Sequence, residues 1–292
     1  DANSTGSYNV GIGQNALGAN TTANNNTAVG TSALAANTTG TENVAVGAIA
    51  LDAQTTASYN TAVGYNAGSA NTTGSQNTFI GRYAGAANTT GADCVVVGSG
   101  AFSTNTTGTS NTAVGKGALN ANTTGDYNTA IGRDALLSNT TASNNTAIGT
   151  SSLDANTTGD HNVGIGAGTL GALTTATNNV AIGRDALTLS NASENVSIGA
   201  YSMDANTTGG NNVAVGYNVL GANTTGGQNT AVGHTALDAN TTASDNTAFG
   251  YGALGANTTG DENVAIGKGA LQAQTTAEDN TAVGTLALAS TN

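Results

Sequence analysis

The sequence predicts an all-β chain that folds as a parallel β-solenoid (β-roll) of about 17 stacked coils. Three observations support this fold: a 17-residue repeat, a glycine that recurs at one position of the repeat, and charges restricted to a few other positions. A fixed short period is typical of a solenoid, in which each repeat forms one coil that stacks on the next. Such a chain has no single place where a unique site must lie, so we expect its function to reside in its shape and repeating surface.

The repeat reads N-T/V-A-V/I-G-x-x-A-L-x-A-N-T-T-G/A-x-x, and its positions are numbered 1 to 17 from the first Asn. Repeats start at Asn9, Asn26, Asn43, Asn60, Asn77, Cys94, Asn111, Asn128, Asn145, Asn162, Asn179, Asn195, Asn212, Asn229, Asn246, Asn263 and Asn280. The repeat that starts at Asn179 has 16 residues. Because nothing else interrupts the period, we expect residues 1–292 to form one rod, cut within a repeat at both ends. Its predicted length is roughly 80 Å at the ~4.8 Å spacing of neighbouring strands.

The repeat positions predict the elements of each coil in order. Positions 1–5 carry β-branched residues and end in a glycine that is present in all 17 repeats, which predicts a short strand followed by a corner. All cations lie at position 6 and all acids at positions 7, 10, 16 and 17, which places solvent at two corners. Positions 8, 9 and 11–14 carry no charge, so the stretch at positions 8–14 is predicted to be a second strand whose position 10 faces solvent. Position 15 is nearly always Gly or Ala and is predicted to be a second corner.

Strand alternation predicts which side chains point inward. With position 10 in solvent, position 9 faces the interior, so Leu17 is expected to meet Val10 and Ile12 of the facing strand. Position 3, which is Ala in twelve repeats, and position 8, mostly Ala, should then form an uncharged outer strip. We expect this strip to pack against identical strips of neighbouring chains. The alternative is that the coil is too narrow for larger side chains on either side.

Composition excludes several classes of function. The net charge is −12 and only 8% of residues are charged, whereas nucleic-acid binding needs clustered Lys and Arg. The apolar runs fall far short of the ~20 residues that span a bilayer, so we predict no membrane insertion. No nucleophile–base arrangement, acid pair, phosphate loop or Cys/His metal pattern is present. We therefore predict no enzyme activity and no cofactor.

The triplet N-T-T recurs at positions 12–14, and each copy matches the acceptor motif for N-glycosylation. The candidate acceptors are Asn20, Asn37, Asn71, Asn88, Asn105, Asn122, Asn139, Asn156, Asn206, Asn223, Asn240 and Asn257. Two alternatives stay open: the asparagines stack as hydrogen-bonded ladders, or sugar is attached to the position-14 hydroxyl, such as that of Thr22. Threonine rows are also found in ice-binding proteins, but the two threonines are adjacent here, which leaves one per coil outside.

One segment departs from the pattern. Position 9 becomes glycine at Gly68 and Gly85, while unusual side chains appear nearby at Tyr65, Phe79, Tyr83, Cys94 and Phe102. The first interpretation is volume exchange, in which a neighbouring aromatic ring fills the space that leucine leaves. The second is a local binding patch or a bend.

The recurrent N-T-A-V-G-x-x-A-L, as in residues 111–119, resembles the S-V-A-I-G-x-x-A coils in the head domains of trimeric autotransporter adhesins. The full 17-residue unit is more similar to repeats of tail-fibre-like proteins from phages and bacteria. This resemblance covers essentially the whole chain and implies a left-handed β-roll, a homotrimer and an extracellular place on a cell-surface appendage or virion fibre. The 17-residue period is longer than that of the adhesin heads, and we expect neither a chaperone domain nor a membrane anchor within residues 1–292.

Together these observations predict a structural fibre shaft or adhesin-like stalk. A first alternative is a self-assembling filament that joins end to end and carries glycans. A second is a solenoid that binds ice, polysaccharide or surface glycans through a Thr/Asn face.

Overall fold

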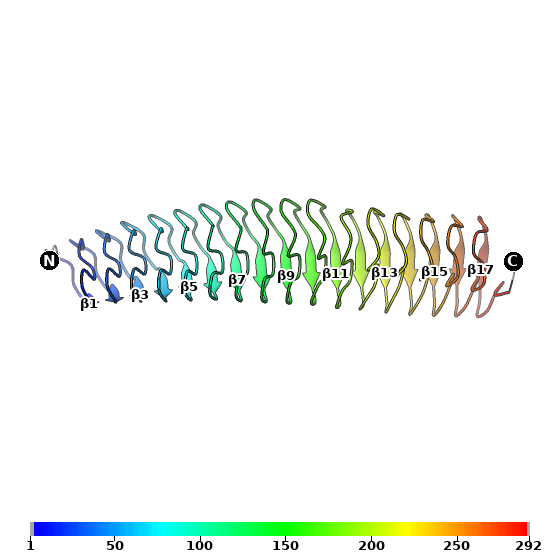
Figure 1. The fold of residues 1–292 in the computed structure, drawn as a ribbon, viewed down its shortest axis with the longest axis horizontal. Coiled ribbons are helices and arrows are strands. Elements are labelled where there is room, and N and C mark those ends of the chain that lie inside the picture. The colour runs from blue at the N-terminus through cyan, green and yellow to red at the C-terminus, as the bar shows by residue number, and fades with distance from the viewer. Residues whose placement is uncertain (1–2, 291–292) are drawn as a thin grey trace. The chain divides into compact units, whose positions relative to one another are not determined.

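The computed structural model describes residues 3–290 and confirms the predicted all-β parallel solenoid. Within these residues there are seventeen strands of three residues, one in each coil, at repeat positions 2–4. The coils group into two compact units, Asp1–Asn145 and Thr146–Asn292. Figure 1 shows each strand as an arrow between the turns of successive coils.

The strands of the first unit are β1 Val10–Ile12, β2 Thr27–Val29, β3 Val44–Val46, β4 Thr61–Val63, β5 Thr78–Ile80, β6 Val95–Val97, β7 Thr112–Val114 and β8 Thr129–Ile131. Those of the second unit are β9 Thr146–Ile148, β10 Val163–Ile165, β11 Val180–Ile182, β12 Val196–Ile198, β13 Val213–Val215, β14 Thr230–Val232, β15 Thr247–Phe249, β16 Val264–Ile266 and β17 Thr281–Val283.

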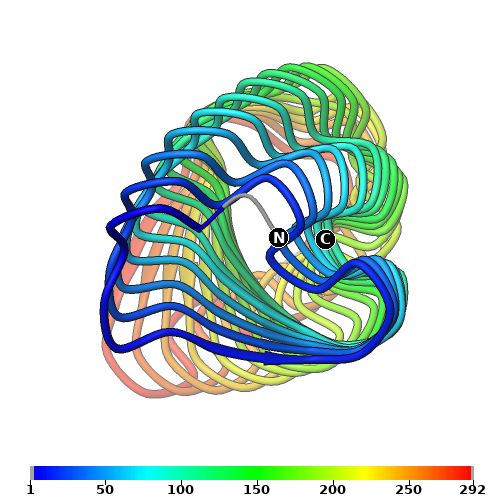
Figure 2. The same ribbon diagram turned by 90° about the vertical axis from the view of Figure 1, so that its left-hand side faces the viewer.

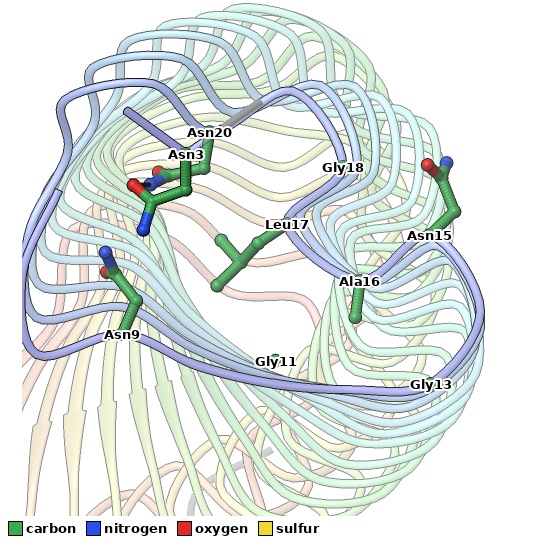
Figure 3. A pocket seen from close by; sticks show the side chains of 9 residues that line it. All are labelled: Asn3, Asn9, Gly11, Gly13, Asn15, Ala16, Leu17, Gly18 and Asn20. Atoms are coloured by element: carbon green, nitrogen blue, oxygen red, sulfur yellow. Dashed lines mark hydrogen bonds between the residues drawn. The ribbon is translucent and has the colours of Figure 1, made fainter. Parts of the chain in front are cut away.

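Within each unit, every strand pairs in parallel with the strand of the next coil. Residues at the same repeat position lie opposite each other, as Val10 does to Thr27 in the first unit. Seen from the N-terminal end in Figures 2 and 3, the first coil runs anticlockwise from Asn9 past Gly13 to Asn20 while later coils recede. The coils are therefore left-handed, as the resemblance implied.

The second predicted strand, at positions 8–14, is wrong. Positions 7 and 9 adopt left-handed backbone conformations in coil after coil, as at Ser32 (φ 56°) and Leu34 (φ 50°). This conformation interrupts an extended strand, and it is uncommon for residues other than glycine. The chain instead folds inward at this point, which carries the leucine of position 9 into the coil, as Figure 3 shows for Leu17.

The prediction that position 9 points inward is confirmed. In the strand, however, the inner and outer faces are reversed: position 3 points inward, and positions 2 and 4 point outward. The position-3 residue of β2–β17 is buried, and the alanines at position 8 are buried in most coils, whereas the position-4 side chains are half-buried or exposed. Ala28, for example, is 0% exposed between Thr27 and Val29 of β2, which are both partly exposed. The outer alanine strip that we expected to join neighbouring chains therefore lies inside each coil.

The narrow interior explains this reversal. A Cβ atom at Gly11, a position-3 residue, would lie 3.4 Å from the carbonyl oxygen of Ala16 and 3.8 Å from a methyl group of Leu17. In coils with leucine at position 9, position 3 is accordingly always Gly or Ala. At Gly164 the side chain is absent altogether, because the hydroxyls of Ser152 and Thr169 occupy that space.

The other half of the interior is polar and consists of two asparagine ladders, at positions 1 and 12. At position 1, the backbone N–H of Asn229 donates to the Oδ1 atom of Asn212 in the preceding coil at 2.9 Å. At position 12, the Nδ2 atom of Asn240 donates to Oδ1 of Asn223 at 2.9 Å. Both ladders converge on position 15, where the Ala243 carbonyl accepts from Asn229 at 2.8 Å and from Asn240 at 3.0 Å. Buried amides thus satisfy one another along the stack.

The 16-residue repeat keeps the strands in register. Val180 still lies opposite Val196, so the missing residue is absorbed outside the sheet. Ser190 replaces the asparagine of position 12 and accepts a hydrogen bond from Nδ2 of Asn206 at 3.1 Å. The Oδ1 atom of Asn191 accepts from the backbone of the preceding coil at 3.0 Å, next to the place of the missing threonine.

Replacing Asn223 with alanine should destabilise the protein by roughly 1–3 kcal/mol for each buried polar group left unpaired. The substitution removes hydrogen bonds to Asn206, Gly226 and Asn240. The measurement is the free energy of unfolding in urea. Asn223→Gln is the control, because Gln54 occupies position 12 naturally and donates to the Ala57 carbonyl at 3.0 Å. Equal stability of the alanine and glutamine variants would contradict the ladder's role.

Candidate functional surfaces

One hollow in the described residues is the open end of the first coil. It measures about 520 Å³ and is lined by Asn3, Asn9, Gly11, Gly13, Asn15, Ala16, Leu17, Gly18 and Asn20 (Figure 3). Most of these residues belong to interior positions that the preceding coil covers elsewhere in the unit. The hollow is thus the solenoid core seen from its end. Within residues 3–290, no group of three or more His, Cys, Asp or Glu side chains is arranged to hold a metal ion, and no helix has the length and apolarity to cross a membrane.

The strand face, defined within each unit as the side chains at positions 2 and 4 of its coils, is the first candidate surface. Position 2 is Thr or Val and position 4 is Val or Ile except at Phe249, so the face carries no charge. Its side chains are unusually open for large apolar residues: Ile131 is 39% exposed and Phe249 is 55% exposed. Extended apolar faces of this kind mark interaction surfaces.

The second candidate surface is a column of aromatic and cationic side chains on the second unit. The rings of Tyr217, His234 and Tyr251 stack with centroids 5.3 Å apart. Arg184 lies over the ring of Tyr201 at one end, and Lys268 lies 5.8 Å from the Tyr251 centroid at the other. Because the rings stack on one another, the column is suited to hold successive coils together. The neighbouring Arg184–Asp185 pair, at 3.7 Å, is well exposed, like Arg133–Asp134 at 3.5 Å, and such pairs contribute about 0–1 kcal/mol.

The structure places all twelve candidate N-glycan acceptors inside the coils. Each is at most 1% exposed. In the coil that contains Asn223, the Nδ2 atom to which a sugar would be attached donates to Asn206 and Gly226, both at 2.9 Å. Attachment there requires both a free amide and an exit from the core. The folded coil provides neither, so these asparagines do not have the surface position that N-glycosylation requires. The same hydrogen bonds form the stacked ladder that was the alternative interpretation.

The two threonines of the triplet have different surroundings. The hydroxyl at position 13 donates to the carbonyl of the same position in the next coil, as Thr224 does to Thr241 at 2.9 Å. The threonine at position 14 is exposed in every coil that has one. In most coils one threonine of the triplet therefore faces solvent, as the sequence predicted, whereas Thr207 and Thr275 of position 13 are exposed as well.

The irregular segment separates into buried and exposed residues. Phe79 lies in β5 at repeat position 3 and is fully buried. A Cβ atom added at Gly68 or Gly85 would lie within 2.6 Å of its ring. The single phenylalanine thus fills the space of two missing leucine side chains, which confirms volume exchange. Cys94 and Phe102 are also buried, at positions 1 and 9. They take part in the core and cannot contribute to a surface patch.

Tyr65 and Tyr83 are the members of this segment that reach the surface. Their rings meet edge to face with centroids 5.5 Å apart, and the guanidinium carbon of Arg82 lies 4.9 Å from the Tyr83 centroid. The cluster resembles the column on the second unit. The structure therefore does not bring the five predicted patch residues together on one surface.

No protein-family profile matches this chain, and no curated protein is similar enough to count as a relative. The likeness to adhesin heads and tail-fibre repeats therefore remains a prediction from the repeat motif.

The volume exchange at Phe79 can be tested with a set of compensating substitutions. Gly85→Leu alone should destabilise the protein by about 1–3 kcal/mol, because it overpacks the core against the Phe79 ring. Phe79→Ala alone should cost about 3–5 kcal/mol through the cavity it leaves. Combining Phe79→Ala with Gly68→Leu and Gly85→Leu restores the regular coil and should recover most of the stability, since leucine adopts the same left-handed backbone in other coils. Additive losses in thermal unfolding would contradict the exchange.

Cys94 should react slowly with thiol reagents while the protein is folded. Burial raises the pKa of its thiol to about 11 from an ordinary value of 9.0, and the Asp93 and Asp126 carboxylates add to this rise. At pH 8 the thiolate, which is the nucleophile, is then about 100-fold scarcer than in the unfolded chain. Because the folded state holds this proton more tightly, the free energy of unfolding should fall as the pH rises from about 9 to about 11. The measurement is the rate of disulfide exchange with an aromatic disulfide, with and without guanidinium chloride. Equal rates in both conditions would show that the thiol is accessible.

Proposed function

We propose that this chain is a structural element, the shaft of an extracellular fibre or adhesin-like stalk, which acts by holding other parts at a distance. The observation that supports this most directly is the ladder of bonds between successive coils within each unit. Backbone bonds such as Val10 N–H to Asn26 C=O (2.9 Å) recur at corresponding atoms along the stack, together with the two asparagine ladders. Load along the stack is then shared by many equivalent bonds in every coil.

We further propose that copies of the chain associate through the strand face, and that the fibre shaft is a trimer. The chain carries a net charge of −12, and its acids lie at positions 7, 10, 16 and 17. Two copies repel each other least where neither presents a carboxylate. The strand face is uncharged, apolar and open in every coil, so it replaces the buried alanines of positions 3 and 8 as the candidate interface.

A second candidate is the self-assembling filament, in which the solenoid itself is the product. The bonds between successive coils support it, because the same bonds between the end coils of two chains would join them without a separate oligomerisation domain. Cryo-electron microscopy of the native material distinguishes the two. Three chains packed through their strand faces, with another domain at one end, would support the shaft. Single columns joined end to end would support the filament, and globular particles without stacked coils would contradict both.

Placing carboxylates on the strand face should dissociate the assembly. The double variant Ile198→Glu and Val215→Glu puts two charges at position 4 of neighbouring coils, where an interface would leave them buried and unpaired. The expected result is a fall from oligomer to monomer mass by light scattering. The single chain should stay folded, because Ile198 is exposed and Val215 is only half-buried in it.

The matched control places the same charges in the same two coils at position 17, as Asn211→Glu and Gln228→Glu. Both residues are exposed, and Glu42 already occupies position 17 with the same backbone conformation. This control should keep the oligomer. A wild-type chain that is monomeric at all concentrations, or equal masses for the two double variants, would contradict association through the strand face.

A further inference from the structure

Position 14 is the most constant exposed position of the repeat. All fifteen repeats of 17 residues carry threonine there, and in each one the side chain is exposed. The row consists of Thr22, Thr39, Thr56, Thr73, Thr90, Thr107, Thr124, Thr141, Thr158, Thr175, Thr208, Thr225, Thr242, Thr259 and Thr276. Other exposed positions vary widely; position 6, for example, holds Tyr65, Arg82, Lys116 and His234. Exposure in this fold therefore does not by itself select threonine.

The structure gives the position-14 hydroxyl no role inside the chain. Among residues 3–290, no hydrogen bond from any of these fifteen hydroxyls to another group of the protein is present, whereas the neighbouring Thr224 hydroxyl donates to the Thr241 carbonyl. The shape of the side chain does not explain its constancy either. At position 2, where shape matters, the chain interchanges threonine and valine freely, as in Thr27 and Val44, but position 14 is never valine. The hydroxyl itself is thus the constant feature.

We propose that the position-14 threonines are acceptors for O-linked, uncharged sugars. In the transfer, Oγ1 attacks the anomeric carbon of a nucleotide-activated sugar, the bond from that carbon to the diphosphate breaks, and the nucleoside diphosphate leaves. The hydroxyl proton passes to a base of the transferase. Charge favours a neutral group, because phosphates spaced at about 4.8 Å along each stack would repel one another and the chain's net charge of −12.

The position of the row is compatible with association through the strand face, although the proposal does not depend on it. Figure 3 shows Asn20, two residues before Thr22, across the coil from Gly11 of β1. Position 14 lies outside the strand, which covers positions 2–4, so sugars on the row would not be attached to the strand face itself. The asparagine of the same triplet is buried, so the acceptor within N-T-T is the second threonine and not the amide.

Mass spectrometry of the protein isolated from its native host tests this assignment. Cleavage before aspartate releases the peptide of residues 204–237, which contains two complete N-T-T triplets. Fragmentation that preserves side-chain modifications should place sugar masses on Thr208 and Thr225, and mild base should remove them by β-elimination. Unmodified threonines at both sites, or sugar on Asn206, Asn223, Thr207 or Thr224 instead, would overturn the proposal.

Matched variants expressed in the same host separate acceptor chemistry from folding. Thr225→Val should lower the intact mass by one glycan in addition to the residue change, and Thr225→Ser should retain the glycan. Thr224→Val removes the part-buried hydroxyl of the same triplet, which donates to the Thr241 carbonyl, and should leave the number of glycans unchanged. Loss of a glycan in Thr224→Val but not in Thr225→Val would contradict the assignment. None of these outcomes depends on the oligomeric state, so they are independent of the shaft proposal.

Discussion

The exact register between successive coils is the constraint on which the rest of the structure depends. Each coil must place its carbonyls and amides opposite those of its neighbours, because an unpaired backbone group inside the stack is costly. Position 5 shows how strict this is. Gly47 has a φ of 139°, and a Cβ atom there would lie 2.4 Å from the carbonyl oxygen of Gly64 in the next coil. No other residue combines that conformation with that approach, which explains why all 17 repeats have glycine at position 5.

Register also determines how the interior is filled. Since the backbones cannot move apart, a change in side-chain volume must be balanced within the same coil or the next one. The large ring of Phe79 is balanced by Gly68 and Gly85, which have no side chain. The hydroxyls of Ser152 and Thr169 are balanced by Gly164. The departures from the repeat in these places are therefore packing solutions and do not indicate a site. A repeat protein tolerates such exchanges only locally, because each coil contacts its immediate neighbours.

The sequence was sufficient to predict the period, the glycine corner, the inward leucine and the exposed threonine of position 14. The errors share one cause. Alternation along a strand defines two faces without saying which is inside, and we took the larger β-branched residues to be the core. In a coil this narrow the interior admits the smaller residues of the strand and the larger ones face outward, so Ala28 lies inside and Val29 outside. The second strand was mispredicted because a left-handed conformation at a residue such as Leu34 has no signature in composition.

The resulting distribution of polarity bears on function. The interior holds amide ladders beside small apolar groups, while the outside carries valine and isoleucine on one face and unpartnered threonine hydroxyls in a row. A single chain gains little from either outer feature. The apolar face loses the stabilisation that burial would provide, and within residues 3–290 the hydroxyl row donates no hydrogen bond to the fold. Both features recur coil after coil, in a repeat whose other exposed positions vary. Their constancy is explained if each has a partner outside the chain, a second copy on the strand face and an attached sugar on the threonine row.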